Sequence, residues 1–474
     1  MTFVSFKFIL FFCVFTIFYF IMPKKLQAYV LLIGSILFYF TFSKQAFIFL
    51  LLSAVVTFYG SKIMYIYHQP IVRKVILFII IGSNLVLLIG LKYGGGVVSE
   101  LGLVVPLGIS FYTLSVIGYV VDIFRMNYSP SRSFLKFLLF MCYFPHILQG
   151  PIARYNQLGS QLEEHHAFDY NRITMGCQLM IWGYIKKMII ADRASLFVDS
   201  VYSQYQLAGG TLMFIASILY SIQIYADFSG CVDIASGVSQ VLGIELACNF
   251  RQPYSAESIN DFWKRWHISL SSWFRDYLYI PLGGNQKGIW RRWLNVLIVF
   301  VISGFWHGVG LNYVVWGLLH GIYQVIGYLL LPIRKKAEKI LYFSGESSVS
   351  RGIHILGTFL LVNFAWIYFR VGSISDANVI IKNIVTDFSP WILTDGSLYN
   401  YGLSEMAFKI LTLFIILMFG IDICHEKKII LRKCIQQEHI VVRWVIYMAA
   451  LLSIFIFGVY GIGYNASNFI YMNF

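Results

Sequence analysis

Three histidines stand out as groups that could move a proton. His267 follows the run Phe-Trp-Lys-Arg-Trp, His307 stands between Phe-Trp and Gly, and His320 follows Trp-Gly-Leu-Leu. Histidine suits general acid and base chemistry because its ordinary pKa lies close to neutral pH. Ionisable side chains inside a membrane are costly, so they are functional candidates by default. We therefore predict catalytic roles for His307 and His267, with His307 as a general base.

The residues around His307 predict a helical hairpin within the membrane. Arg292 marks a cytoplasmic start, an apolar helix and a Gly-rich turn at 306–312 follow, and a second helix returns to Arg334. His307 and His320 lie 15 and 14 residues from these basic ends, so both should be roughly 21–23 Å from the cytoplasmic edge. A hydrocarbon core is about 30 Å thick, so the turn ends inside it. Irregular backbone at that depth must be covered by protein or water, so we expect His307 at the floor of a funnel open to the outside.

A structural role is the alternative for both histidines of the hairpin. A buried, hydrogen-bonded imidazole that closes the hairpin would need the same residue type, and spacing leaves this open for His307 and His320. We expect no metal site, because the hairpin lacks the Cys, Asp or Glu that would complete one. The seven cysteines of the chain are odd in number and lack paired spacing, so they are predicted to be packing residues.

The segment that carries His267 is predicted to be one amphipathic helix. Aromatic residues recur at three- and four-residue steps over 259–277, and Ser258 with Asp261 has the spacing of a capping box at the start. Its charged face and its tryptophans are typical of a helix at the cytoplasmic membrane surface. His267 falls at the border of the two faces, where it could contact the protein interior and a ligand. The alternative is an interfacial histidine bonded to a backbone carbonyl.

Carboxylates also occur at the end of an apolar run. Asp227 and Asp233 lie in Tyr-Ala-Asp-Phe-Ser-Gly-Cys-Val-Asp, and residues 144–154 interrupt another run with Pro and Gly. Both clusters would be costly in lipid without internal partners. Pairing of these carboxylates with Arg154 or Arg265 is at least as good an interpretation as catalysis, and both remain open.

Composition places these residues in a membrane protein. Of the 474 residues, 58% are apolar and 12% charged, and runs long enough to cross a bilayer recur throughout. We predict an all-α polytopic integral membrane protein with about 11–13 transmembrane helices and additional interfacial or re-entrant helices. The run at 3–22 lacks a small-residue cleavage site and is followed at once by another, so it reads as a retained helix.

The net charge of +14 resides in short connectors at alternate helix ends. This distribution favours contact with anionic membrane lipids rather than binding of nucleic acid, which needs one basic face. By the positive-inside rule we place the N-terminus outside the cytoplasmic membrane. We expect a single domain over 1–474, divided into N-terminal helices (1–100), a catalytic core (101–335) and C-terminal helices (336–474).

The central motifs resemble those of the membrane-bound O-acyltransferase (MBOAT) family, in the branch typified by the alginate O-acetylation membrane protein. They are the run from Phe262 to Asn285, Phe-Trp-His-Gly at 305–308 and Trp-Gly-Leu-Leu-His-Gly at 316–321. Weaker support comes from 106–113, 144–154, 227–233, 249–254 and the terminal 469–474. The first hundred residues and the loop at 373–404 match only in hydropathy.

The resemblance implies transfer of an acyl group, usually acetyl, from a cytoplasmic thioester to an acceptor across the membrane. It implies that His307 is essential and that His267 is the second functional position. His307 would take the proton of an attacking hydroxyl, and the oxyanion donors are not identified. We expect an acyl thioester such as acetyl-CoA as donor substrate, no tightly bound cofactor, and substrate contacts from a further set of residues. These are Trp306, Arg265, Arg275, His320 and Asp227.

The family resemblance also implies a partner. The ending Tyr-Ile-Pro-Leu-Gly-Gly at 279–284 and the long chain favour polysaccharide O-acetylation over D-alanylation of teichoic acid. Members of the former branch often pass the acyl group to an extracytoplasmic acetyltransferase, so polysaccharide would be reached indirectly. Two alternatives stay open: D-alanyl transfer for teichoic acid, and a transporter or scaffold of a polysaccharide export complex without acyl chemistry.

Overall fold

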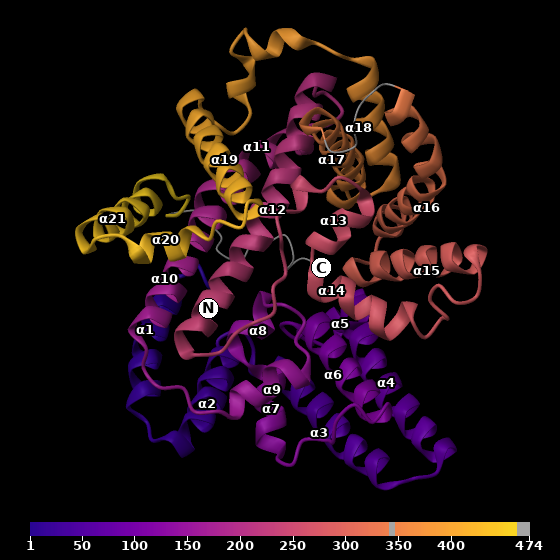
Figure 1. Ribbon diagram of the computed structural model, residues 1–474, viewed down its shortest axis with the longest axis vertical. Helices are drawn as coiled ribbons and strands as arrows, with labels where there is room; N and C mark the ends of the chain where they lie inside the picture. The colour runs from indigo at the N-terminus through magenta and orange to yellow at the C-terminus, as the bar shows by residue number, and fades with distance from the viewer. Residues whose placement is uncertain (341–346, 462–474) are drawn as a thin grey trace. The chain divides into compact units, whose positions relative to one another are not determined.

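The computed structural model describes residues 1–340 and 347–461 (Figure 1). Within these ranges the chain forms helices and connecting segments and no β-strand, so the predicted all-α fold is confirmed. The terminal motif at 469–474 lies outside the described residues.

Eight helices are long and apolar enough to cross a membrane among the described residues. They are α3 (Lys44–Ile66), α4 (Pro70–Tyr93), α12 (Gly210–Leu242), α15 (Ile289–His307), α16 (Leu311–Ile340), α17 (Ser348–Arg370), α19 (Glu405–Glu426) and α21 (Ile440–Phe457). Shorter apolar helices are α1 (Phe6–Ile21), α6 (Ile109–Phe124) and α7 (Phe134–Cys142), which continues into α8 (Phe144–Gln149). The predicted polytopic membrane architecture is therefore confirmed.

The remaining helices are shorter and connect or brace these spans. They are α2 (Gln27–Phe40), α5 (Gly95–Glu100), α9 (Tyr155–Glu163), α10 (Tyr170–Tyr184), α11 (Asp192–Ser203), α13 (Ile259–Arg265), α14 (Ile268–Phe274), α18 (Ile374–Thr386) and α20 (Leu431–Gln437). Wider π-helical turns occupy Ile185–Ala191 and Arg275–Tyr279, and tight 3₁₀ turns occupy Lys24–Leu26, Pro253–Ser255, Pro390–Leu393 and Ser397–Asn400.

The chain divides into two compact units that alternate along the sequence. The first comprises residues 1–182 and 231–248, and the second comprises residues 183–230 and the described residues from 249 onward. Helix α12 contributes to both. The expected single domain and its three parts remain a prediction, because these units describe packing only.

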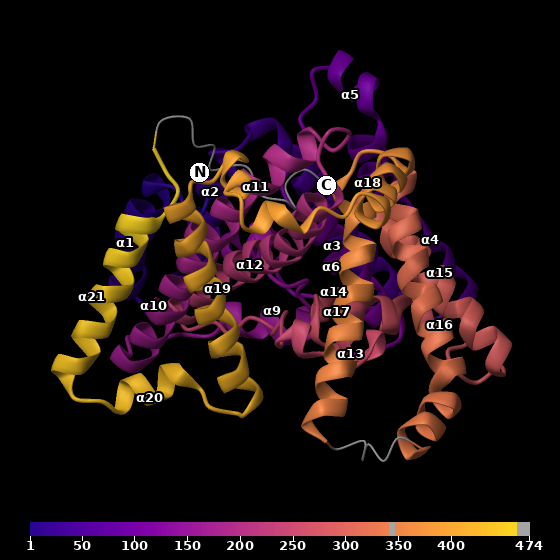
Figure 2. The same cartoon turned by 90° about the horizontal axis from the view of Figure 1, so that it is seen from above.

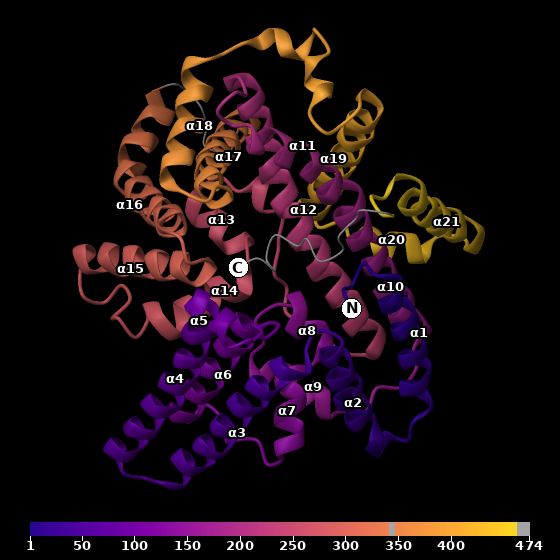
Figure 3. The same ribbon diagram turned by 180° about the vertical axis from the view of Figure 1, so that it is seen from behind.

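In the first unit, α3 and α4 form a hairpin that packs against α6 and α7 (Figure 3). A polar bridge inside this hairpin joins Asn84 of α4 to Ser53 and Thr57 of α3, at 2.5 Å and 3.3 Å. Buried amides in an apolar layer are stable only with such partners. This unit thus gains specific helix pairing from polar bonds in addition to apolar packing.

In the second unit, α15 and α16 form the hairpin expected from the sequence, and α16 also packs against α17 (Figure 2). The core of this unit is aromatic. Trp266, Trp316 and Trp366 are among its largest fully buried side chains. The indoles of Trp316 and Trp366 stack with centroids 5.6 Å apart, so the hairpin and α17 share one aromatic core.

Candidate functional site

Two glycines allow the helices of the hairpin to cross closely. A Cβ on Gly304 of α15 would lie 2.3 Å from the carbonyl oxygen of Tyr313, and one on Gly317 of α16 would lie 2.2 Å from that of Phe300. Both distances are far below van der Waals contact, so only glycine fits at this crossing. The Gly residues beside the Trp-His and Trp-Gly motifs therefore set the spacing of the two helices.

His307 is the last residue of α15 and is 2% exposed. Its imidazole packs edge-on against the rings of Trp306, Trp316 and Phe369, with centroids 4.9, 5.0 and 5.4 Å away. Rings from α15, α16 and α17 thus enclose it on several sides. An imidazole held this way has a fixed position at the helix end, which general base catalysis requires.

The turn after His307 is anchored to the end of α17. The side-chain amide of Asn312 donates to the carbonyl oxygens of Tyr368 and Val371, at 3.2 Å and 2.8 Å. These carbonyls belong to the last turn of α17 and the residue after it, where helical partners are missing. Asn312 is 2% exposed, so this tie holds the turn against α17 from inside the unit.

His320 and His307 both contact the indole of Trp316, but they lie at different heights along the axis of the hairpin. The ring centroids of Trp316 lie 5.0 Å from His307 and 5.2 Å from His320. His320 follows Leu311, the first residue of α16, by nine residues, which is about 13 Å along the helix axis. The two histidines therefore lie at different levels along the hairpin, because Arg292 of α15 lies over Tyr328 of α16, 4.5 Å from its ring centroid, rather than beside Arg334.

The segment around His267 is not the single helix that its periodicity predicts. Helix α13 ends at Arg265, α14 begins at Ile268, and His267 between them has φ 44° and ψ 54°, in the left-handed region. The predicted capping bond is confirmed: Ser258 Oγ accepts from the backbone N–H of Asp261 at 3.1 Å. The prediction of one continuous helix is wrong, because the left-handed backbone at His267 separates α13 from α14.

The aromatic residues of this segment face protein rather than lipid. Trp263, Trp266 and Trp273 are 8%, 1% and 8% exposed, and His267 is fully buried. A position at the border of a membrane-surface helix is therefore wrong for His267. Burial lowers its pKa from the ordinary value to about 3, because a buried imidazolium loses its hydration.

The side chain of Asn249 meets His267 inside the unit. Its Oδ1 lies 3.3 Å from Nδ1 of His267 and accepts from the backbone N and the Oγ of Ser269, at 3.1 Å and 2.8 Å. Asn249 is 1% exposed. It was identified in the sequence only as part of a supporting family motif, and no local pattern places it beside His267, 18 residues later.

Trp306 links the two histidines that we predict to be catalytic. Its ring centroid lies 6.2 Å from that of His267 and 4.9 Å from that of His307. His320 joins the same cluster through Trp263, whose Nε1 donates to His320 Nδ1 at 3.2 Å. The structure therefore brings all three histidines and Trp306 into one aromatic cluster of the second unit.

A cavity of about 440 Å³ extends along the hairpin beside this cluster. One face of α15 forms a wall of it, and the residues on this face are Arg292, Val296, Val299, Phe300 and Ser303. These positions follow helical spacing, and His307 is the next position on the same face, four residues beyond Ser303. The cavity thus follows the face of α15 that ends in His307.

Cationic and polar side chains complete the cavity. Lys264, Arg275 and Arg292 supply three positive charges, and Arg275 is also bonded to its neighbour Asp276 at 2.7 Å. Further polar lining comes from Asn260, Ser271, Ser272, Asn285 and Gln324. Such a cavity suits a ligand with an anionic head and an uncharged arm.

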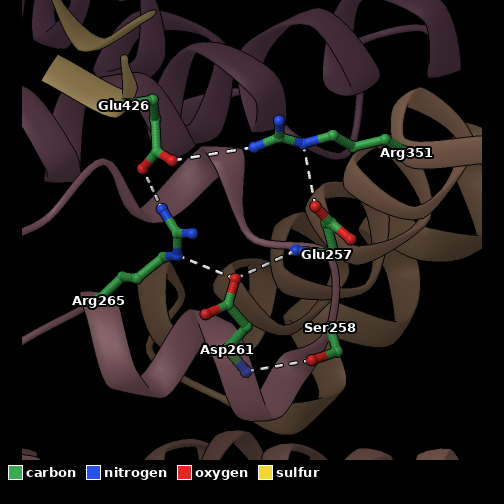
Figure 4. Close-up of polar contacts among 6 residues, drawn as sticks. All are labelled: Glu257, Ser258, Asp261, Arg265, Arg351 and Glu426. Atoms are coloured by element: carbon green, nitrogen blue, oxygen red, sulfur yellow. Dashed lines mark hydrogen bonds and ion pairs between the residues drawn. The ribbon is translucent and has the colours of Figure 1, made fainter. Parts of the chain in front are cut away.

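Arg265 lies in a separate ion-pair network (Figure 4). Its Nε bonds Asp261 at 2.9 Å, and its Nη1 bonds Glu426 at the end of α19. Arg351 of α17 bonds Glu257 at 2.9 Å and lies 3.9 Å from Glu426. Three carboxylates face two guanidinium groups in this network. Arg265 thus joins α13 to α19, Arg351 adds α17 through the shared Glu426, and Arg265 is not part of the cavity lining.

Asp227 pairs with a lysine that was not among the partners expected from the sequence. Lys187 Nζ lies 2.7 Å from Asp227 Oδ1 and 2.7 Å from Asp192 Oδ1, and its side chain is 2% exposed. Its neighbour Lys186 donates to Ser229 at 3.0 Å. These two lysines, which the charge pattern places at a cytoplasmic helix end, are therefore buried in a π-helical turn.

Comparison with known proteins gives matches that include the residues of this site. Residues 127–338 match the model of the MBOAT, membrane-bound O-acyltransferase family. Similar curated proteins include a probable alginate O-acetylase of Pseudomonas fluorescens, 33% identical over 67% of this chain and 61% of that protein. A peptidoglycan O-acetyltransferase of Helicobacter pylori is 33% identical over 60% of this chain and 58% of that protein.

A teichoic acid D-alanyltransferase of Streptococcus thermophilus is more distant, at 26% identity over 56% of this chain and 68% of that protein. The chain spans about three fifths of the length of the two O-acetylating relatives. The matched stretch contains the hairpin, the His267 segment and the cavity between them. Residues 127–338 of this multi-pass membrane chain therefore form a region that matches the membrane-bound O-acyltransferase family.

Proposed function

We propose that this protein is an O-acyltransferase that moves an acetyl group from a cytoplasmic thioester to a hydroxyl group on the outer side of the cytoplasmic membrane. The product is an O-acetylated extracellular or cell-wall polysaccharide. The observation that carries the proposal is the continuous face of α15, on which the cavity-lining positions from Arg292 to Ser303 lead to the buried imidazole of His307.

The cavity supplies the donor side of this proposal. Lys264, Arg275 and Arg292 are three cations suited to the phosphates of a coenzyme A thioester. Its apolar wall along Val296, Val299 and Phe300 suits an uncharged arm that carries the acetyl group toward Ser303. Trp306 and His320 belong to the aromatic cluster that encloses the reacting end.

The chemistry requires a hydroxyl, a base and a thioester. The acceptor oxygen attacks the acetyl carbonyl carbon, a C–O ester bond forms and the C–S bond breaks. His307 takes the hydroxyl proton as the oxygen attacks, and the departing thiolate receives a proton to leave as a thiol. The buried setting of His307 keeps water from competing with the acceptor.

The acceptor side is shared with a partner. The relatives are named for acetylation of alginate and of peptidoglycan, both polymers with many hydroxyl groups. We propose that an extracytoplasmic acetyltransferase or acyl-acceptor protein receives the acetyl group and delivers it to the polymer. By the positive-inside rule, the proposal has the N-terminus outside and the cavity open to the cytoplasm.

The test compares base-labile acetate on the extracellular glycan of cells that carry the wild-type chain or His307→Ala, at equal membrane levels and with neighbouring envelope genes intact. We expect His307→Ala to lower the acetate by about 10²–10⁴-fold, the size of a lost general base. His68→Ala is the matched control, because His68 is exposed in the connection between α3 and α4.

Each alternative predicts another result. Persisting acetate in His307→Ala cells would support a scaffold or transporter and overturn the role of the base. Loss of ester-linked D-alanine in place of acetate would assign the chain to the teichoic acid reaction of its more distant relatives. A purified chain that acetylates glycan without other proteins would remove the partner from the proposal.

A further inference from the structure

We infer that Asn249 is the positioning residue of His267, holding its Nδ1–H so that Nε2 is the acceptor nitrogen of the ring. The inference rests on the proposed function, in which His267 takes part in use of the donor. It adds a residue to the reaction and assigns the tautomer with which His267 acts.

The bonds at Asn249 determine which atom of its amide faces His267. The backbone N–H of Ser269 can only donate, and it points at Oδ1 from 3.1 Å. Exchange of the amide oxygen and nitrogen would place two donors against each other, so the acceptor here is the oxygen. An amide oxygen cannot donate, so the bond at 3.3 Å requires a proton on His267 Nδ1. A neutral imidazole then keeps its lone pair on Nε2.

Backbone bonds fix the same two segments against each other. The N–H of Ile268 donates to the carbonyl oxygen of Asn249 at 3.0 Å, and the N–H of Arg251 donates to that of Arg265 at 2.9 Å. They brace His267 in a left-handed conformation that non-glycine residues rarely adopt. Asn249 therefore holds its neighbour through both its backbone and its side chain.

The tautomer limits what His267 can do in acyl transfer. With its lone pair on Nε2, the ring can accept a proton or a hydrogen bond from an N–H or O–H group of the substrates. It cannot donate from Nε2 to the oxyanion. In hydrolases with a Cys-His-Asn arrangement, an asparagine plays the same part toward a catalytic histidine.

The groups packed around His267 are consistent with a neutral ring. Phe228 of α12 and Trp306 of α15 lie 4.8 Å and 6.2 Å from it between ring centroids. Two charged residues are close in sequence to these rings and to His267, and both form ion pairs elsewhere. Asp227 pairs with Lys187, and Arg265 pairs with Asp261 and Glu426. The neighbouring titratable group on α15 is His307. Burial lowers the pKa of His267 further, which favours the neutral form.

Asn249→Asp is the variant that tests the tautomer most directly. Asn249 Nδ2 has no hydrogen-bond partner among the described residues, so exchange of this group for an oxygen breaks no bond. A carboxylate keeps the acceptor for Ser269 and His267, and its negative charge favours the imidazolium and raises the pKa of His267. Because only neutral Nε2 can accept, the acid limb of kcat/KM must move to higher pH.

The experiment follows thiol release from acetyl-coenzyme A by membranes containing the full chain, between pH 5 and 8.5. Because the pKa of wild-type His267 is about 3, its acid limb lies below this range. We expect Asn249→Asp to raise the limb into the range, so that kcat/KM falls toward pH 5 more steeply than in wild type, and Asn249→Ala to lower kcat/KM by about 10–100-fold. Asn363→Asp is the control, since Asn363 is 4% exposed in α17 and bonds Ser217 and Ser221 instead of a histidine. It should reduce the amount of folded protein and leave the acid limb in place.

Melting temperatures over the same pH range test the inference without activity. In the wild type, the unfolded state binds a proton at His267 below about pH 6.5 and the native state does not, so stability falls as the pH falls. In Asn249→Asp the native state also binds that proton, so the fall should be shallower. Equal pH slopes in both proteins, or an active Asn249→Asp with an unmoved acid limb, would overturn the assignment. Absence of thiol release from the wild type would instead contradict the proposed function, and the melting curves would still decide the role of Asn249.

Discussion

Nε1 of Trp263 donates a hydrogen bond to Nδ1 of His320 across 3.2 Å of the buried core. Nδ1 therefore carries no proton, and His320 is neutral with its proton on Nε2. Trp263 belongs to α13 and His320 to α16, so this bond ties the segment of His267 to the hairpin of His307. His320 and His267 thus have opposite tautomers, and we expect His320 to join the two segments rather than to act as a base.

Trp263→Phe should lower stability while leaving the chemistry largely intact. The substitution leaves buried Nδ1 of His320 without its donor, which costs about 1–3 kcal/mol. We expect a lower melting temperature in detergent and less protein in the membrane, with thiol release per folded molecule within a few-fold of wild type. A loss of turnover as large as that of His307→Ala would give His320 a direct part in the reaction.

Gly317→Ala should separate the helices of the hairpin. Its Cβ would lie 2.2 Å from the carbonyl oxygen of Phe300, so α15 and α16 must move apart, at a cost of about 1–3 kcal/mol. We expect a lower melting temperature and slower thiol release, because His307 is the last residue of α15 and would move with it. Gly327→Ala is the control in the same helix, where a Cβ meets nothing within 4 Å, and it should be neutral or slightly stabilising.

His267→Asn and His267→Ala separate the ring from the backbone conformation. Asparagine tolerates the left-handed region better than alanine, so His267→Asn should be the more stable of the two. Both should lose thiol release by about 10²-fold or more if the imidazole is required. Between pH 6.5 and the lowered pKa of about 3, His267→Asn should lose less stability with falling pH than wild type, by up to about 1.4 kcal/mol per pH unit. Full activity in His267→Asn would exclude a role for the ring.

Lys187→Met should be severely destabilising. It leaves the carboxylates of Asp192 and Asp227 buried without the cation that lies 2.7 Å from each, which typically costs about 3–5 kcal/mol. The amount of folded protein after detergent extraction measures the effect. Adding Asp227→Asn removes one of the two charges and should restore part of the loss. No restoration would mean that Lys187 acts through something other than charge.

Charge reversal in the cavity should weaken use of the donor. Arg292→Glu and Lys264→Glu each remove a cation from the lining, and loss of a charged hydrogen bond of about 1.5–3 kcal/mol raises KM roughly tenfold to a hundredfold. KM for acetyl-coenzyme A should rise with little change in kcat. Arg291→Glu is the neighbouring control, because Arg291 is exposed and lies outside the lining. Equal KM values for Arg292→Glu and Arg291→Glu would place the donor elsewhere.

Local patterns in the sequence were enough to predict several parts of this protein. Apolar runs determine the helical membrane class, since a backbone in lipid must bond within itself. The basic start of α15 and the Gly-rich turn predicted the hairpin with His307 at its tip, and Ser258 with Asp261 predicted the start of α13. These features depend on neighbouring residues, so the sequence alone specifies them.

Contacts between distant segments decided the rest. The periodicity of 259–277 continues through His267, but backbone and side-chain bonds from Asn249 stabilise a break there that no local preference favours. Tertiary packing also buried the aromatic stripe and paired Lys187 with Asp227. The sequence shows which polar groups need partners. Only the folded chain determines which partner each group meets, because the distances between partners depend on the packing of helices that are far apart in the sequence.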